Sequence, residues 1–128
     1  RENLESHTRI LMRPSDMELR ALYAGAWIVC LPTLTRTNPA GPTSLVEGMA
    51  CGAVVAIPET IAEGYIEDGA NGLVLTESPS DFVARLHSLH DTLPLIRQKA
   101  RHFAESELNN ITVASHLKNR LQAERVLD

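Results

Sequence analysis

The residues best suited to chemistry lie close together, in residues 38–55. Gly41 has no Cβ, so the backbone there can approach a bound group closely, and Pro42 presets φ for the first turn of a helix. Thr43 and Ser44 add hydroxyl groups beside the main-chain amides of that helix start. Such amides lie at the positive end of the helix dipole, so this spacing predicts a cradle for an anionic group such as a phosphate.

An acidic side chain follows one helical turn later. Glu47 comes four residues after Thr43 and three after Ser44, which places the three side chains on one face of the helix. A carboxylate does not bind phosphate, but it accepts hydrogen bonds from the hydroxyls of a sugar attached to that phosphate. The alternative, from the residues alone, is a solvated glutamate on an ordinary helix start.

A strand, a loop, a helix and a second strand are expected to position these residues. The apolar run at residues 27–31 predicts a parallel strand covered on both faces. The loop at residues 33–40 leaves the carboxyl end of that strand, where open α/β sheets bind ligands. It contains Arg36, which is either a phosphate contact or a solvated loop residue. The helix then ends at Gly52 before a strand at residues 53–57, and its apolar face consists of Leu45, Val46, Met49 and Ala50.

The rest of the chain continues this alternation. A capping box at Ser15 and Glu18 precedes a helical apolar stripe made of Leu19, Leu22, Tyr23 and Ala26. Short strands are expected at residues 9–12 and 72–75. Three further helices are expected from caps or apolar stripes near Ser78, Thr92 and Thr112, the last with Ala114, Leu117 and Leu121 facing inward.

These elements predict the fold class. About four short strands alternating with helices are typical of an α/β, Rossmann-like layered domain with a short, mostly parallel sheet. The 128 residues form one domain by length. Residues 1–8 are polar and unpatterned, and we expect them to be frayed or to be the cut edge of a longer protein.

Two ordered motifs resemble the donor-site region of the group 1 (family 4) retaining glycosyltransferases, which have the two-domain GT-B architecture. Members with this form of the motif usually have the sequence Glu-Gly-x-Pro-x-x-x-Leu-Glu-Ala-Met-Ala-x-Gly, followed by a Pro-Val-Val strand. The residues that fit here are Gly41, Pro42, Leu45, Val46, Glu47, Met49, Ala50, Gly52, Val54 and Val55. Residues 66–74 resemble the family's segment I-E-D-G-x-N-G-L-L-V. The resemblance runs from about Ser15 to the last helix and covers only part of a family member.

The resemblance implies a nucleotide-diphosphate sugar as substrate, without a metal or another cofactor. The donor-binding residues that it implies are Gly41, Pro42, Thr43, Ser44, Leu45 and Glu47, with the amides at Thr43 and Ser44 on the diphosphate and Glu47 on the ribose. The family's first glutamate falls at Pro39, which has no carboxylate, so no catalytic residue is assigned. The family's basic pair for the diphosphate precedes the matching part, and its acceptor pocket lies in a different domain.

Two functions therefore stay open. In the first, the chain is the donor-binding portion of a retaining glycosyltransferase, and it is inactive or weak without a missing N-terminal acceptor domain or partner subunit. In the second, it is a catalytically inactive GT-B-like module for docking or dimerisation. With the usual strand order 3-2-1-4-5-6, the strand at residues 9–12 would lose its neighbours. Either that strand pairs with the strand at residues 27–31, or its edge is covered by another copy of the chain, because an open apolar sheet edge is prone to pair with another chain. We expect a homodimer, formed through that edge or by swapping.

The composition of the chain argues against some classes of binding partner. The chain is 44% apolar and 22% charged, as in ordinary globular proteins. A formal net charge of −4 argues against a general nucleic-acid or anionic-membrane binder. No run approaches the roughly 18 apolar residues of a membrane span, and no signal peptide is recognisable. We expect a cytoplasmic protein, with peripheral membrane association of the full-length enzyme left open.

The metal-binding residue types do not form a persuasive site. Cys30 and Cys51 lack zinc-site spacing and are expected to be reduced core thiols. His87, His90 and Asp91 share one helix at metal-compatible spacing, but a convincing further ligand is lacking, so we expect surface residues there.

Overall fold

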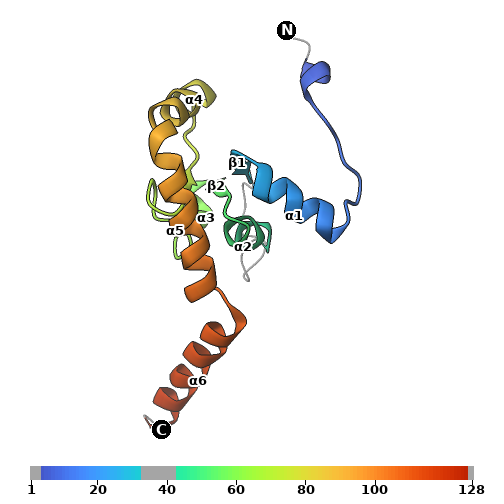
Figure 1. The fold of residues 1–128 in the computed structure, drawn as a ribbon. Coiled ribbons are helices and arrows are strands. Elements are labelled where there is room, and N and C mark those ends of the chain that lie inside the picture. The colour runs from blue at the N-terminus through green and yellow to red at the C-terminus, as the bar shows by residue number, and fades with distance from the viewer. Residues whose placement is uncertain (1–3, 33–42, 127–128) are drawn as a thin grey trace.

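The structure of the protein is a computed structural model, which describes residues 4–32 and 43–126 (Figure 1). The described elements are the 3-10 helices η1 (Leu4–His7) and η2 (His90–Thr92), the strands β1 (Ile28–Cys30), β2 (Val54–Ile57) and β3 (Leu73–Val74), and the helices α1 (Asp16–Gly25), α2 (Thr43–Ala50), α3 (Glu59–Ala62), α4 (Pro79–Ser88), α5 (Leu93–Ser106) and α6 (Asn110–Val126). Strands alternate with helices, and the predicted α/β class is confirmed.

The described strands form one parallel sheet in the order β1-β2-β3. Val29 pairs with Val55 across β1 and β2, and Ile57 pairs with Val74 across β2 and β3. All four residues of β2 are buried, as expected for the central strand of a sheet covered on both faces. Because the strands are parallel, their carboxyl ends lie at one edge of the sheet.

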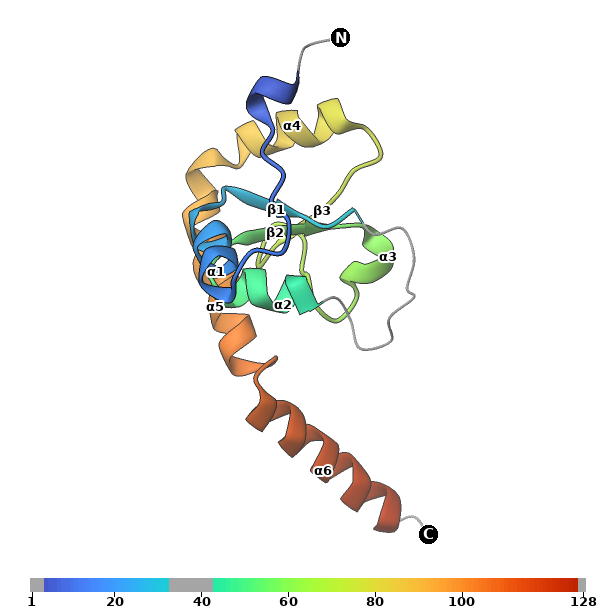
Figure 2. The ribbon, with the colours of Figure 1, turned by 90° about the vertical axis from the view of Figure 1, so that its right-hand side faces the viewer.

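Helices cover both faces of this sheet (Figure 2). On the side of α2, the buried residues form one cluster that includes Leu45, Met49, Val55 and Ile57, with Ala100 and Ala104 from α5. On the side of α4, a second cluster consists of Val54, Ala56, Leu73, Phe82, Leu93 and Ile96. Successive residues of β2 enter opposite clusters, since side chains alternate along a strand.

A close contact between α2 and β2 depends on a glycine. A Cβ built on Gly48 would lie 3.0 Å from Cγ2 of Val55. The missing side chain therefore lets the helix pack tightly on the strand, although glycine lowers helix propensity by about 1 kcal/mol relative to alanine. The predicted helix end is confirmed at Gly52, which has a φ of +74° and donates its N–H to the carbonyl of Met49.

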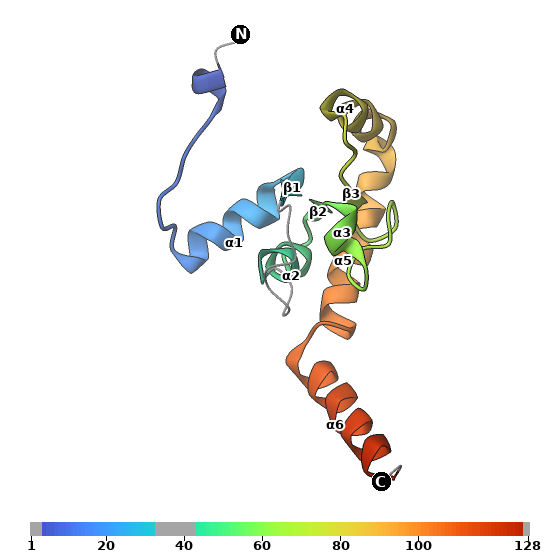
Figure 3. The ribbon, with the colours of Figure 1, turned by 180° about the vertical axis from the view of Figure 1, so that it is seen from behind.

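The predicted strand at residues 9–12 is wrong. These residues belong to none of the strands, and the side chains of Ile10 and Met12 are 80% and 84% exposed. Figures 1 and 3 draw this segment at the end of α1 that is far from β1. An extended segment without a neighbouring strand has no ladder bonds and no apolar face to bury, so it stays irregular.

Helix α1 forms as predicted but packs less than expected. Its capping box is confirmed: Glu18 N–H donates to Ser15 Oγ at 3.3 Å, and Ser15 N–H donates to Glu18 Oε2 at 2.9 Å. These bonds hold the pKa of Glu18 below its usual value. Throughout α1, whose residues are all described, no side chain is fully buried, and Leu22 is 44% exposed. The apolar stripe is therefore only partly covered.

Other packing predictions also need correction. Helix α6 forms, but Ala114 is exposed rather than inward-facing, and Figures 1 and 2 show α6 projecting away from the sheet. The side chains of Leu117 and Leu121 lie outside the described part.

Both cysteines are free thiols, but Cys30 is exposed, because β1 has only β2 beside it among the described strands. The described helices include none that is long and apolar enough to cross a membrane.

Candidate functional site

The candidate site lies at the edge of the sheet where the strands end. Helix α2 begins there at Thr43, after the loop that leaves β1, and α3 begins there at Glu59, directly after β2 (Figure 2). In open α/β sheets this edge is the usual place for a ligand. Of the residues predicted for the site, Arg36, Gly41 and Pro42 lie outside the described residues, as does Pro39, the position of the family's first glutamate.

The first turn of α2 offers both main-chain and side-chain groups. Thr43 is exposed and Ser44 is partly buried. In a helix that starts at Thr43, the first four N–H groups have no acceptor within the helix, so they remain available to an anion or a cap. Leu45 has no exposed surface and belongs to the core cluster under α2. Any contact of Leu45 with a ligand would therefore be made by its backbone.

The carboxylate of Glu47 lies one turn further along α2 and is exposed to solvent. Its Oε2 accepts a hydrogen bond from the hydroxyl of Tyr23 on α1, with a donor–acceptor distance of 3.3 Å. Sequence reasoning placed Tyr23 only in the apolar stripe of α1 and missed this contact. The signal is absent from local spacing, because 24 residues separate the two partners.

Tyr23 is partly buried between the two helices, and its surroundings favour the neutral phenol. Burial is the main cause that raises the pKa of Tyr23. The hydroxyl of Ser44 acts in the opposite direction, whereas the negative charge of Glu47 raises the pKa further. Tyr23, Ser44 and Glu47 therefore form one polar cluster across α1 and α2, and Tyr23 is its hydrogen-bond donor at neutral pH.

The loop between α3 and β3 is held by its own polar side chains. The buried amide of Asn71 accepts from Glu67 N–H at 2.8 Å and donates to the carbonyl of Tyr65 at 3.1 Å. Asp68 Oδ1 accepts from Val74 N–H and from Nη2 of Arg85, both at 2.8 Å. Asp68 and Asn71 thus stabilise the turn of the second sequence motif, whose last residues form β3.

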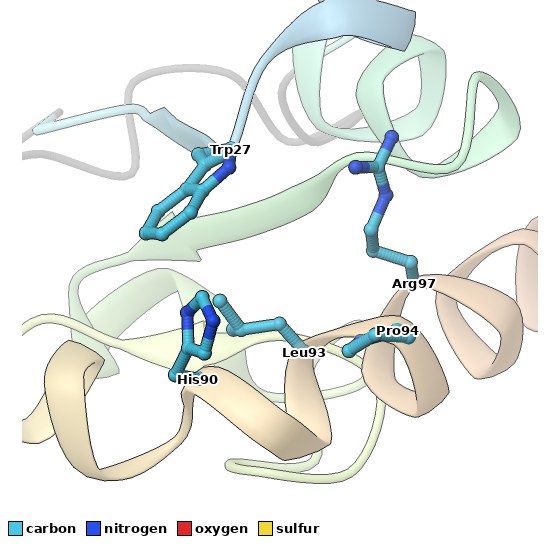
Figure 4. A pocket seen from close by; sticks show the side chains of 5 residues that line it. All are labelled: Trp27, His90, Leu93, Pro94 and Arg97. Atoms are coloured by element: carbon cyan, nitrogen blue, oxygen red, sulfur yellow. The ribbon is translucent and has the colours of Figure 1, made fainter.

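Two shallow cavities lie beside these elements. One, of about 300 Å³, borders the same loop and is lined by Gly64, Tyr65, Ile66, Glu67, Asn71 and Phe103. The other, of about 170 Å³, lies at the amino end of β1 and is lined by Trp27, His90, Leu93, Pro94 and Arg97 (Figure 4).

The polar and aromatic side chains around the second cavity already have partners within the protein. The rings of Trp27 and His90 are in contact in a tilted arrangement, with their centroids 5.3 Å apart. Arg97 donates through Nε to the carbonyl of Gly52 at 2.7 Å and through Nη2 to the carbonyl of Ala24 at 2.8 Å.

Among the described residues, no cluster of three or more histidine, cysteine, aspartate or glutamate side chains could hold a metal ion.

The fold and the sequence were compared with known proteins. The fold resembles the crystal structure of Anabaena Alr3699/HepE in complex with UDP-glucose, with a TM-score of 0.66 and 18% sequence identity. That match covers 83% of this chain but only 30% of the other one, so this chain spans less than a third of that protein's length. A search of curated protein sequences found no match.

A family comparison also covers most of the sequence. The family described as "Glycosyl transferases group 1" matches residues 1–92, which is well over half of the chain. The parallel sheet, the helix at its carboxyl edge and this match agree with the resemblance drawn from the two motifs. The chain belongs to the group 1 glycosyltransferases and has the Rossmann-like fold of a GT-B domain.

Proposed function

We propose that this chain is the part of a retaining glycosyltransferase that binds the nucleotide-diphosphate sugar donor. The observation that carries the proposal is the exposed carboxylate of Glu47, one turn from the start of α2 at the carboxyl edge of the sheet. The amides and hydroxyls of Thr43 and Ser44 would receive the diphosphate. Glu47 would accept hydrogen bonds from the ribose hydroxyls, which are donors that a carboxylate can pair with.

We further propose that the chain has little or no transferase activity by itself. Transfer requires positive groups that stabilise the charge developing on the leaving diphosphate. The described candidates Thr43, Ser44, Leu45 and Glu47 include no cation. The acceptor site and those positive groups would come from an N-terminal domain or a partner subunit. No metal or other cofactor enters the proposal, and the free thiols are compatible with action in the cytoplasm.

Binding of nucleotide diphosphates tests the first proposal. The isotope-labelled chain is titrated with UDP, GDP and ADP while its amide signals are followed. We expect one of them to shift the signals of Thr43 to Glu47 at millimolar concentration. Replacing Glu47 with glutamine removes the charge but keeps the shape, so affinity should fall about tenfold, as for a lost charge-assisted hydrogen bond.

A matched variant controls for the loss of one negative charge. Asp91→Asn changes an exposed carboxylate in η2, next to His90 and the amino end of β1 and so at the edge of the sheet opposite to the start of α2, and should leave the affinity unchanged. If all three nucleotides leave the amides of Thr43 to Glu47 unperturbed, the chain is not a donor-binding domain.

A non-catalytic docking or dimerisation module is the second candidate. The observation that favours it is Pro39, which stands where the family has its first glutamate. Sugar-nucleotide hydrolysis or transfer by the complete enzyme would select the first candidate. Donor binding without turnover in the complete enzyme would select the second.

A further inference from the structure

The contact between Tyr23 and Glu47 links α1 to the candidate donor site. Tyr23 lies on α1, outside both motifs that carry the family resemblance, and its hydroxyl donates to Oε2 of Glu47 at 3.3 Å. The inference below rests on the proposed function, because it concerns how Glu47 is presented to the donor.

An exposed glutamate is a poor recognition group unless something orients it. Its side chain has several rotatable bonds, and a ligand that uses it must first restrict those rotations. The hydrogen bond from Tyr23 restricts them before any ligand arrives. A carboxylate has about four acceptor positions, so accepting from Tyr23 leaves capacity for the two hydroxyls of a ribose.

Tyr23 is well placed for such a role. Its ring is partly buried between α1 and α2, whereas the carboxylate that it contacts is exposed. The phenol stays neutral in these surroundings and so remains a donor toward Glu47. The hydroxyl of Ser44 lowers and the charge of Glu47 raises the pKa of this phenol, so the pKa of Tyr23 responds to two residues of the candidate site.

We propose that Tyr23 is a positioning residue, which aims the Glu47 carboxylate at the ribose and thereby sets the preference of the site for ribonucleotides over deoxyribonucleotides. The donor class is a nucleoside diphosphate with free ribose hydroxyls. Tyr23 itself does not need to touch the donor.

The test compares UDP with 2′-deoxy-UDP, or the corresponding pair for whichever base the chain binds best. In the wild-type chain we expect the ribonucleotide to bind more tightly. Tyr23→Phe should reduce that preference by up to about fivefold, the effect of one lost hydrogen bond, because it weakens the ribonucleotide more than the deoxynucleotide, which offers Glu47 only its 3′-hydroxyl. In Glu47→Gln the preference should be lost, and adding Tyr23→Phe to it should change nothing more, because the two residues act through one contact.

Tyr65→Phe is the matched control. It removes the hydroxyl of the only other tyrosine in the sequence, on the loop beyond α3, and should leave the preference intact. The midpoint of thermal unfolding of each variant shows whether the fold is retained.

Three outcomes overturn the inference, and they are distinct. If Tyr23→Phe weakens both nucleotides equally, Tyr23 only supports the fold. If it changes neither affinity while the ribonucleotide preference persists, Glu47 does not need it. If the wild-type chain binds no nucleotide diphosphate at all, the proposed function fails and this inference fails with it.

Discussion

At the scale of single residues, two glycines allow close packing against the central strand β2. Gly48 lets α2 approach β2. Gly72 lets the loop before β3 lie close to the side chain of Ile66 and to the backbone of β2. A Cβ on Gly72 would lie 2.3 Å from Cδ1 of Ile66 and 3.0 Å from the carbonyl oxygen of Val55. The first neighbour is the end of a flexible side chain, but the second is backbone of the central strand and cannot move cheaply.

Gly72→Ala should therefore lower the free energy of unfolding by about 1–3 kcal/mol, the usual effect of overpacking a core. Urea denaturation measures it. Combining it with Ile66→Val removes the nearest colliding atom and should restore part of the loss.

Gly25→Ala provides the contrast. A Cβ there has nothing within 4 Å, and the residue ends α1, so stability should stay level or rise by up to about 1 kcal/mol. Equal losses for the two alanine variants would contradict the close-packing explanation.

At the scale of elements, Arg97 connects three helical segments by hydrogen bonds. It lies on α5, and its two nitrogens reach the carbonyl of Ala24 near the end of α1 and that of Gly52 just after α2. Helix ends have carbonyls without intrahelical partners, and a cation near them is favoured by the dipole. One planar guanidinium thus satisfies two helix ends and sets α1 against α2, the pair that brings Tyr23 to Glu47.

Arg97→Lys keeps the charge but cannot donate to both carbonyls in this fixed geometry. We expect the free energy of unfolding to fall by about 1–3 kcal/mol, from one or two lost hydrogen bonds to a charged group. Arg101→Lys is the matched control on the same helix: Arg101 makes an exposed pair with Glu105 one turn away, and its replacement should change stability little. The measurement is again urea denaturation, and similar effects of the two substitutions would contradict the connecting role.

At the scale of the whole molecule, β1 is an open edge in the described structure. It pairs with β2 on one side, and the residue just before it, Trp27, is an apolar side chain that is 62% exposed. Leu31 N–H donates to the carbonyl of Ala56, so the alternation of a strand directs the N–H of Cys30 away from β2. An outward N–H and apolar neighbours are what a second strand needs for pairing.

We accordingly predict a homodimer through the β1 edge, to be measured by sedimentation of the chain at increasing concentration. Cys30→Pro removes the outward N–H and should favour the monomer, since proline blocks pairing at an edge. Leu31→Pro removes an N–H that bonds within the sheet and should instead destabilise the fold. A wild-type chain that remains monomeric at all concentrations would contradict the prediction.

Much of the local structure could be predicted from the sequence. The capping box of α1, the end of α2 at Gly52 and the buried strand β2 follow from hydrogen bonds and apolar spacing within a few residues. The position of Glu47 one turn into α2 was predicted for the same reason. The strand at residues 9–12 failed because a strand exists only with a neighbour, and its neighbour is not among the described elements.

By itself, then, the sequence determined most of the helices, the strands of the described sheet, the family, and the helix start at the sheet edge, since these depend on neighbours in the chain. The tertiary structure decided which strand is the open edge, that Leu45 is core, and that Tyr23 meets Glu47. Such contacts join residues far apart in sequence, and only the packing of α1, α2 and α5 against one another and the sheet brings them within reach.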